Sequence, residues 1–189
     1  KNSDAQWKVV GNQVVFSPIE TLDVLDNMDA WDGYPMERNR IIHFLDSLAI
    51  DNVVVLTGDV HVGIAADVTA QPDEAYDPET GEGAFAVELV TTSVSSFNLD
   101  EAGDIGLPFT IEQIQDVALG INPHGKFANL WGHGYFLLDL TDTKAQADWW
   151  WVDTVAYHSN VEYQQVSWYT NNGENFLQMA TEAAVDVAD

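Results

Sequence analysis

The sequence contains no cysteine and very few basic residues. Without cysteine, disulfide bonds and thiolate metal sites are excluded. Six Lys and Arg stand against 31 Asp and Glu, which gives a formal net charge of −25. Because binding to nucleic acid or to anionic lipid depends on basic side chains that neutralise phosphates, we expect no nucleic-acid-binding surface. Cations, small molecules and basic surfaces are the partners that such a charge favours.

Long apolar runs and common nucleotide motifs are also missing. No run approaches the roughly 20 residues needed to cross a bilayer, so we expect no membrane span. The first residues, Lys1 to Asp4, carry neither an apolar targeting region nor a twin-arginine pair, although the chain can begin inside a longer precursor. The absence of a Gly-rich phosphate loop and of a Gly-x-Ser-x-Gly elbow gives P-loop nucleotide binding and serine hydrolase chemistry little support.

What the chain has is enough apolar material for one domain with a core: 189 residues, 46% hydrophobic and 11% aromatic. Residues 7–16 predict a buried strand, and the continuous apolar run 52–57 predicts a central strand covered on both faces. A further strand is expected over 84–92. Residues 135–140 and 147–155 predict a hairpin across the polar turn 141–144.

Helices are expected at three places. Pro35 suits the first position of a helix whose apolar side carries Ile41, Phe44, Leu45 and Leu48, with Arg38 on the opposite, polar side. A short helix is predicted around residues 111–118 and a closing helix over 176–184, while 20–34 and 71–83 read as loops. A strand, a helix and a strand followed by mostly antiparallel strands indicate an α/β sandwich.

The tetrapeptide Gly58-Asp59-Val60-His61 directly follows the predicted central strand. Open α/β sheets bind ligands beyond the carboxyl ends of their strands, and Gly58 permits a sharp turn there. A carboxylate and an imidazole two residues apart on an extended segment can point to one side and bind one metal ion or two adjacent ones. The alternative is that Asp59 caps a turn and His61 is an ordinary, partly buried histidine.

Two other places offer groups that could contact phosphate. His124 and Lys126 lie together in the segment 122–126, which is either a phosphate-binding loop or a turn built by Asn-Pro and Gly. Arg38 follows the aromatic segment 31–34 and would grip an anion through two parallel hydrogen bonds. Equally, Arg38 can pair with one of the many carboxylates.

Several segments, in this order, resemble the PhoD-like alkaline phosphatases: residues 7–13 (WKVVGNQ), 31–38 (WDGYPMER), 56–61 (LTGDVH), 122–126 (NPHGK), 134–141 and 147–155. The resemblance extends over about residues 7–185. It implies a calcineurin-like metallophosphoesterase core, a four-layer αββα sandwich, of which residues 1–189 form the C-terminal half within a single domain. The N-terminal half is absent from this chain.

The resemblance also implies a site and an activity. Gly-Asp-Val-His takes the place of the motif that ends the phosphatase metal site, with Asp59 a ligand of Ca²⁺ and His61 a ligand of Fe³⁺. Phosphate monoesters and diesters are the implied substrates, and a secreted, periplasmic or cell-surface location is the implied compartment. His124 and Arg38 are the expected phosphate contacts.

Two departures from the family pattern affect this interpretation. The family's remaining ligands come from the N-terminal half, so this chain supplies at most two ligands and is expected to be inactive without that partner. In addition, His133 stands where many relatives carry Arg, which puts substrate preference in doubt. The competing hypothesis is a non-catalytic, acidic surface or assembly module that retains the fold.

Overall fold

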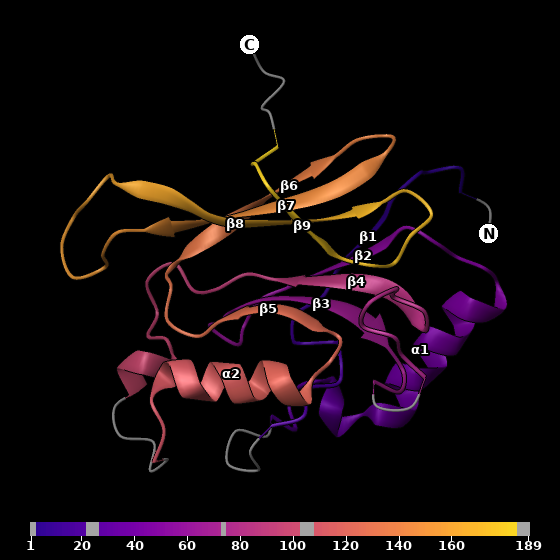
Figure 1. Cartoon of the computed structure of the whole chain (residues 1–189), viewed down its shortest axis with the longest axis horizontal. Helices are drawn as coiled ribbons and strands as arrows, with labels where there is room; N and C mark the ends of the chain where they lie inside the picture. Colours follow the sequence, from indigo (N-terminus) through magenta and orange to yellow (C-terminus); the bar gives the residue numbers. More distant parts are fainter. Residues whose placement is uncertain (1–2, 22–26, 73–74, 103–107, 185–189) are drawn as a thin grey trace.

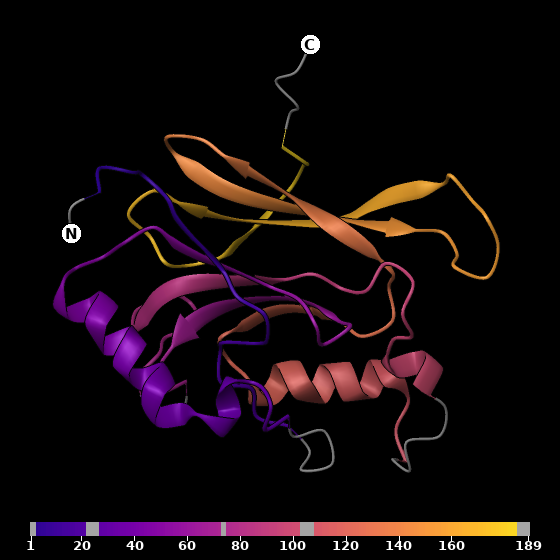
Figure 2. The ribbon, with the colours of Figure 1, turned by 180° about the vertical axis from the view of Figure 1, so that it is seen from behind.

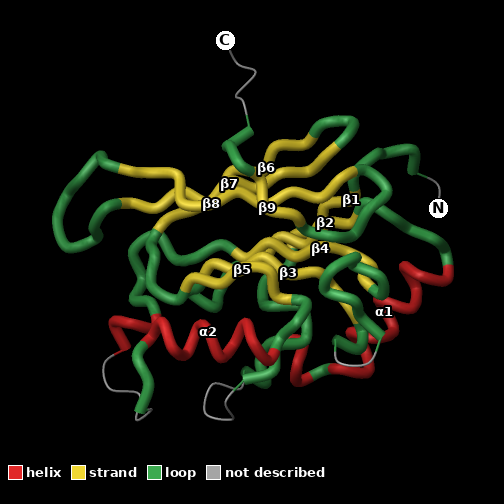
Figure 3. The backbone as a smooth tube through the Cα atoms, in the orientation of Figure 1, coloured by secondary structure: helices red, strands yellow, loops and turns green. Residues whose placement is uncertain are grey.

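In the computed structural model, which describes residues 3–21, 27–72, 75–102 and 108–184, two β-sheets stack face to face (Figure 1). Within these residues, two α-helices cover the outer face of the larger sheet, and the view from behind shows the same three layers (Figure 2). Strands fill the two upper layers and helices the lowest one (Figure 3). The prediction of a mixed α/β architecture is therefore confirmed.

The larger sheet has five strands in the order β1-β2-β4-β3-β5. Strands β1, β2 and β4 run parallel, whereas β3 pairs antiparallel with both β4 and β5. The bounds are Lys8–Gly11 for β1, Val53–Thr57 for β2, Gly63–Thr69 for β3, Ala84–Val90 for β4 and Gly125–Asn129 for β5. The predicted strands at 52–57 and 84–92 are confirmed, and β2 is buried between two neighbours as expected.

The smaller sheet is an antiparallel meander in the order β6-β7-β8-β9. Its strands are Gly134–Leu140 for β6, Lys144–Val152 for β7, Glu162–Asn171 for β8 and Gln178–Ala180 for β9. The hairpin predicted across residues 141–144 is confirmed by the pairing of β6 with β7.

The main core lies between the two sheets. Trp149 of β7 is completely buried there, with its ring near those of Phe127 and Phe136 at centroid distances of 5.5 and 5.3 Å. Its indole N–H donates to the carbonyl of Val90 at 3.2 Å, so the polar edge of the ring is satisfied as well. This packing explains why the tryptophan run at 149–151 alternates between the inside and the outside of the smaller sheet.

The two helices pack against the other face of the larger sheet. Helix α1 spans Pro35–Ser47 and α2 spans Ile111–Ile121, which confirms both predicted helices. The predicted face of α1 is wrong in part, however: Arg38 and Ile42 are its buried residues and Leu45 packs against the same core cluster as predicted, whereas Phe44 is 56% exposed. Burial of Arg38 is tolerated because its guanidinium pairs with the Asp32 carboxylate, a partner that the apolar spacing of the helix does not reveal.

Two predicted elements are corrected by the structure. The strand expected over 7–16 is reduced to β1, an edge strand whose Val9 and Val10 are 43% and 45% exposed. The helix expected over 176–184 is instead a loop and the short strand β9, because Leu177 is buried between the sheets and its N–H donates to Asp67. Strands β3, β5 and β8 lie in segments where no strand is predicted from the sequence.

A buried carboxylate, Asp67 in β3, joins three distant parts of the chain. Its oxygens accept hydrogen bonds from the Tyr76 hydroxyl at 2.6 Å and from the Leu177 N–H at 2.8 Å. The Lys126 ammonium lies 3.5 Å from it and also packs over the Phe176 ring at 4.4 Å. Burial nevertheless raises the pKa of Asp67 to about 6, against the lowering effect of these three partners.

We predict that Asp67→Asn makes the unfolding free energy less dependent on pH between about 4 and 7. Because burial raises the pKa of Asp67 from 3.8 to about 6, the folded protein holds this proton more tightly than the unfolded chain does. The stability that this bound proton contributes is fully present below pH 3.8 and is lost as the pH rises through about 6. The shift corresponds to roughly 3 kcal/mol.

Urea denaturation at about pH 4, 5, 6 and 7 measures this effect. As the pH rises, the unfolding free energy of the wild type should fall relative to that of Asp67→Asn. The exposed Asp46→Asn variant serves as the control. A smaller pH dependence remains in the variant, since burial raises the pKa of Glu88 as well. Parallel pH profiles for wild type and Asp67→Asn would contradict the prediction.

Candidate metal centre

The loop 58–61 leaves the carboxyl end of β2, the strand at the middle of the parallel part of the sheet. Asp59 and His61 both have left-handed backbone conformations, with φ of 73° and 59°. Such conformations cost a non-glycine residue of the order of 1 kcal/mol and concentrate at functional sites. The expected extended segment is therefore wrong: the loop is a tight turn, closed by a hydrogen bond from the Val60 N–H to the Gly58 carbonyl.

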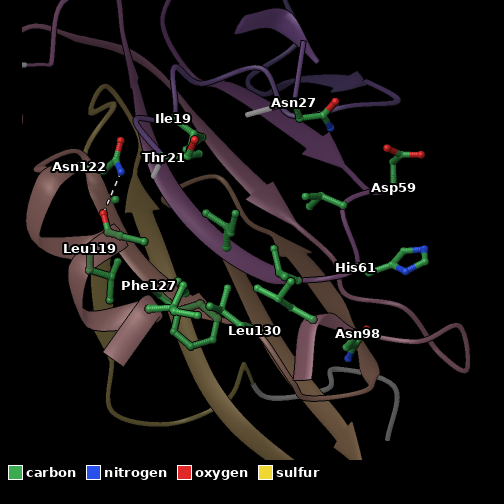
Figure 4. A pocket seen from close by; sticks show the side chains of 18 of the residues that line it. Ile19, Thr21, Asn27, Asp59, His61, Asn98, Leu119, Asn122, Phe127 and Leu130 are labelled. Carbon is green, nitrogen blue, oxygen red and sulfur yellow. Dashed lines mark hydrogen bonds between the residues drawn. The ribbon is translucent and has the colours of Figure 1, made fainter. Parts of the chain in front are cut away.

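The turn still presents the two predicted ligands together. Asp59 is exposed, and His61 is partly exposed. Figure 4 shows both polar groups directed away from the apolar side chains that surround the neighbouring pocket. Between them, Val60 packs against the apolar cluster under α2, and Val62 is part of that cluster. Polar and apolar side chains thus alternate along the loop, and its two valines anchor it to this cluster.

A backbone carbonyl orients the His61 ring. Its Nδ1 lies 2.6 Å from the carbonyl oxygen of Phe97, and the two rings meet edge to face at 5.7 Å. Because a carbonyl oxygen only accepts hydrogen bonds, Nδ1 must carry the proton. In the neutral ring Nε2 then holds the lone pair, which is the arrangement found in metal-ligating histidines.

The segment that carries Phe97 is itself fixed by Asn98, which is almost completely buried. Its side-chain N–H groups donate to the carbonyls of Trp131 and Gly132 at 3.0 and 2.9 Å. Its side-chain oxygen accepts from the Ser93 hydroxyl at 2.6 Å. Asn98 therefore ties the segment that follows β4 to the loop before β6, and this fixes the carbonyl that orients His61.

His133 belongs to the same assembly of loops. Its ring nitrogens lie 3.2 Å from the Ser93 hydroxyl and 3.2 Å from the Glu101 carboxylate. Residues 93–101 were not singled out from the sequence, although a run of Ser and Asn directly after a buried strand is a usable signal for a polar loop.

Arg38 and His124 are not brought together with Asp59 and His61, and neither lines the pocket beside them. Arg38 is buried in α1 against Asp32, whose other oxygen accepts from the Ile19 N–H at 3.2 Å. His124 is fully buried, with Nε2 2.7 Å from the Pro18 carbonyl. These contacts give both residues a structural role, and their phosphate contacts stay predictions.

Within the residues that the structure describes, no three His, Asp or Glu side chains gather as a metal-binding group. Asp59 and His61 are thus a pair of donors and not a complete site. Over the same residues, no helix is both long enough and apolar enough to cross a membrane.

Comparison with known proteins agrees with this fold. The family model of the PhoD-like phosphatases matches residues 1–149. Alkaline phosphatase D of Bacillus subtilis (strain 168) is 33% identical over 153 residues, which are 78% of this chain and 24% of that protein. A solved structure of PhoD superposes on 98% of this chain and 34% of its own, with a TM-score of 0.75 and 26% identity. The chain belongs to the PhoD-like phosphatase family and spans about a quarter to a third of these relatives.

We predict that Asn98→Ala changes the tautomer of His61 through the carbonyl of Phe97. The Trp131 carbonyl would lose this buried donor, so the unfolding free energy should fall by about 2 kcal/mol. The Phe97 carbonyl would no longer be held, and His61 should change from the Nδ1–H tautomer to a mixture. Nitrogen-15 NMR of the imidazole measures the tautomer, with the exposed Asn160→Ala as the control. Retention of a pure Nδ1–H tautomer in Asn98→Ala would show that the loop does not set the ring.

Proposed function

We propose that this PhoD-like chain takes part in the hydrolysis of phosphate monoesters and diesters, and that it contributes Asp59 and His61 to a dinuclear metal site. The observation that carries the proposal is the turn 58–61: two left-handed residues present a carboxylate and an imidazole on one side, and a carbonyl fixes the imidazole with Nε2 available. A turn that only linked two strands would not require a second residue to orient its histidine.

The donor types fit the metals that the family resemblance implies. A carboxylate oxygen suits Ca²⁺, and an imidazole nitrogen suits iron, so Asp59 would hold the first and His61 the second. When bound, such a metal pair would supply a hydroxide near neutral pH and would neutralise charge on the phosphoryl group. The protein's own part is to hold the two donors in place, through Phe97 for His61 and through the packed valines for the loop.

Charge supports a role for bound cations. With a net charge of −25, the surface repels a phosphate ester at long range. Arg38, one of the two predicted phosphate contacts, is paired with Asp32. Lys126, which lies two positions after the other contact, His124, is paired with Asp67. Local attraction for phosphate would therefore come from cations at Asp59 and His61, since a bound divalent or trivalent ion can reverse the sign of the potential at a site.

Two donors do not complete a dinuclear centre, so the proposal includes a partner. We infer that the N-terminal half of the same enzyme, in the same precursor or as a separate chain, provides the remaining ligands and the fourth layer of an αββα sandwich. Two observations support this: the described helices cover only the five-stranded sheet, and the chain spans 24% of its curated relative (Figure 1). By the same resemblance, we place the enzyme outside the cytoplasm, secreted, periplasmic or on the cell surface.

We predict that native material contains iron and calcium and hydrolyses a chromogenic phosphate ester, whereas the isolated 189-residue chain does not turn over. Asp59→Ala and His61→Ala should each reduce turnover more than about 100-fold, because even changes outside the ligand shell cost 10- to 100-fold. Elemental analysis, intact mass and the ester assay measure these outcomes together.

The matched controls are Asp46→Ala and His43→Ala, which change the same residue types on the exposed surface of α1. Both should keep full turnover and metal content. Native material without metal, partner or turnover would refute the phosphatase proposal and would favour a non-catalytic acidic module.

A further inference from the structure

A pocket of about 420 Å³ lies beside the candidate metal centre, between α2 and the strands β3 and β5. Asp59 and His61 stand at one side of it, and the remaining wall is mostly hydrocarbon (Figure 4). The apolar wall includes Val60, Ile64, Ile114, Leu119, Phe127 and Leu130. Its volume lies within the range of about 300–1,000 Å³ that is typical of small-molecule sites.

We propose that this pocket receives the hydrocarbon part of the substrate, so that the preferred phosphate esters are those of extended, apolar alcohols. The inference rests on the proposed function, because the phosphate end of the ester is placed at Asp59 and His61. It goes further by naming the class of alcohol. The predicted phosphate-ester site and the apolar pocket share Asp59 and His61. This arrangement favours a ligand with one charged and one apolar end.

Two of the asparagines around the pocket, Asn98 and Asn122, favour an apolar occupant over a sugar or another polyol. Asn98 uses its amide on Trp131, Gly132 and Ser93, as described above. Asn122 donates to the carbonyls of Glu20 and Ala118 and accepts from the Glu20 N–H, all at 2.8 Å. A polyol would lose its hydrogen bonds to water and find these amides already engaged, which costs free energy.

Charge and geometry restrict the ligand further. A surface with a net charge of −25 is repelled by anionic membranes, which favours a dispersed amphiphile over a lipid within an anionic bilayer. The polar ends of Asp59 and His61 point away from the apolar side chains (Figure 4). An alcohol chain that starts at those ends must pass over the rim of the pocket before it reaches the apolar wall. Short alkyl chains therefore gain nothing, and affinity rises only beyond a threshold length.

The test is calorimetric titration of this chain, with Ca²⁺ added as the cation for the phosphate end, with n-alkyl phosphates from butyl to decyl, below micelle formation and in about 0.5 M NaCl to screen the surface charge. Beyond the threshold, each added methylene should tighten binding about fourfold, because its burial transfers one CH₂ group out of water. Ala118→Phe, which places a ring into the pocket from α2, should weaken decyl phosphate about tenfold or more. Ala156→Phe, the same change in an exposed loop, should have no effect.

Equal affinities for butyl and decyl phosphate, or unchanged binding in a folded Ala118→Phe variant, would overturn the proposal. Decanol provides a readout that needs neither phosphate nor metal. If decanol binds in an Ala118-dependent way but decyl phosphate does not, the pocket is apolar without being an ester site, and the proposal is again overturned. Failure of the proposed function gives a different result. Native material would then contain no metal and show no turnover, while the binding of alkyl phosphates would persist.

Discussion

The position of the candidate metal centre depends on one buried carboxylate, that of Glu88 in β4. It accepts hydrogen bonds from the Thr57 hydroxyl at 2.6 Å and from the N–H groups of Phe16 and Ser17 at 2.8 and 2.7 Å. Thr57 is the last residue of β2 and directly precedes the turn that carries Asp59. The three donors fix the end of β2 and hold the segment after β1 beneath the sheet. Since the group is fully buried, a lost donor would leave a polar atom unsatisfied at a cost of about 1–3 kcal/mol.

Other interior carboxylates are satisfied in the same manner. Among the described residues, the buried carboxylates are those of Asp67, Glu88 and Asp148, and of these Asp67 has an ion-pair partner. Asp148 accepts instead from Gln146, Ser167 and the Ala184 N–H. Asp67 has Lys126 but also the Tyr76 hydroxyl and the Leu177 N–H. Backbone N–H groups and hydroxyls thus connect distant segments, which adds specific long-range contacts to a fold whose surface charge opposes compaction.

These long-range hydrogen bonds also explain which parts of the fold were predictable from the sequence. Strand β2, helix α1 and the β6–β7 hairpin have local signals: an apolar run, a proline start and a polar turn between two apolar segments. Residues 176–184 have a locally helical pattern, but the Asp67 carboxylate, 110 positions away from Leu177, holds that residue in an extended connection. Burial of Arg38 and His124 depends in the same way on Asp32 and on the Pro18 carbonyl. No residue spacing within a helix or loop reveals such partners.

The candidate site shows the same division between local and distant information. Asp59 and His61 stand out because a polar pair follows an apolar strand, whereas Phe97 and Asn98 act through backbone carbonyls that a sequence pattern does not show. Their contribution is to establish the site before any ligand arrives. Val62 in the core, Val60 packed against it and the Phe97 carbonyl offset the cost of two left-handed residues without help from a metal ion. A metal ion that bound here would therefore meet a folded loop and an oriented imidazole, and less of its binding free energy would be consumed in ordering the loop. Under the proposed function the chain would provide only part of a coordination shell, and a loop that is already folded suits that role because the remaining ligands would come from elsewhere.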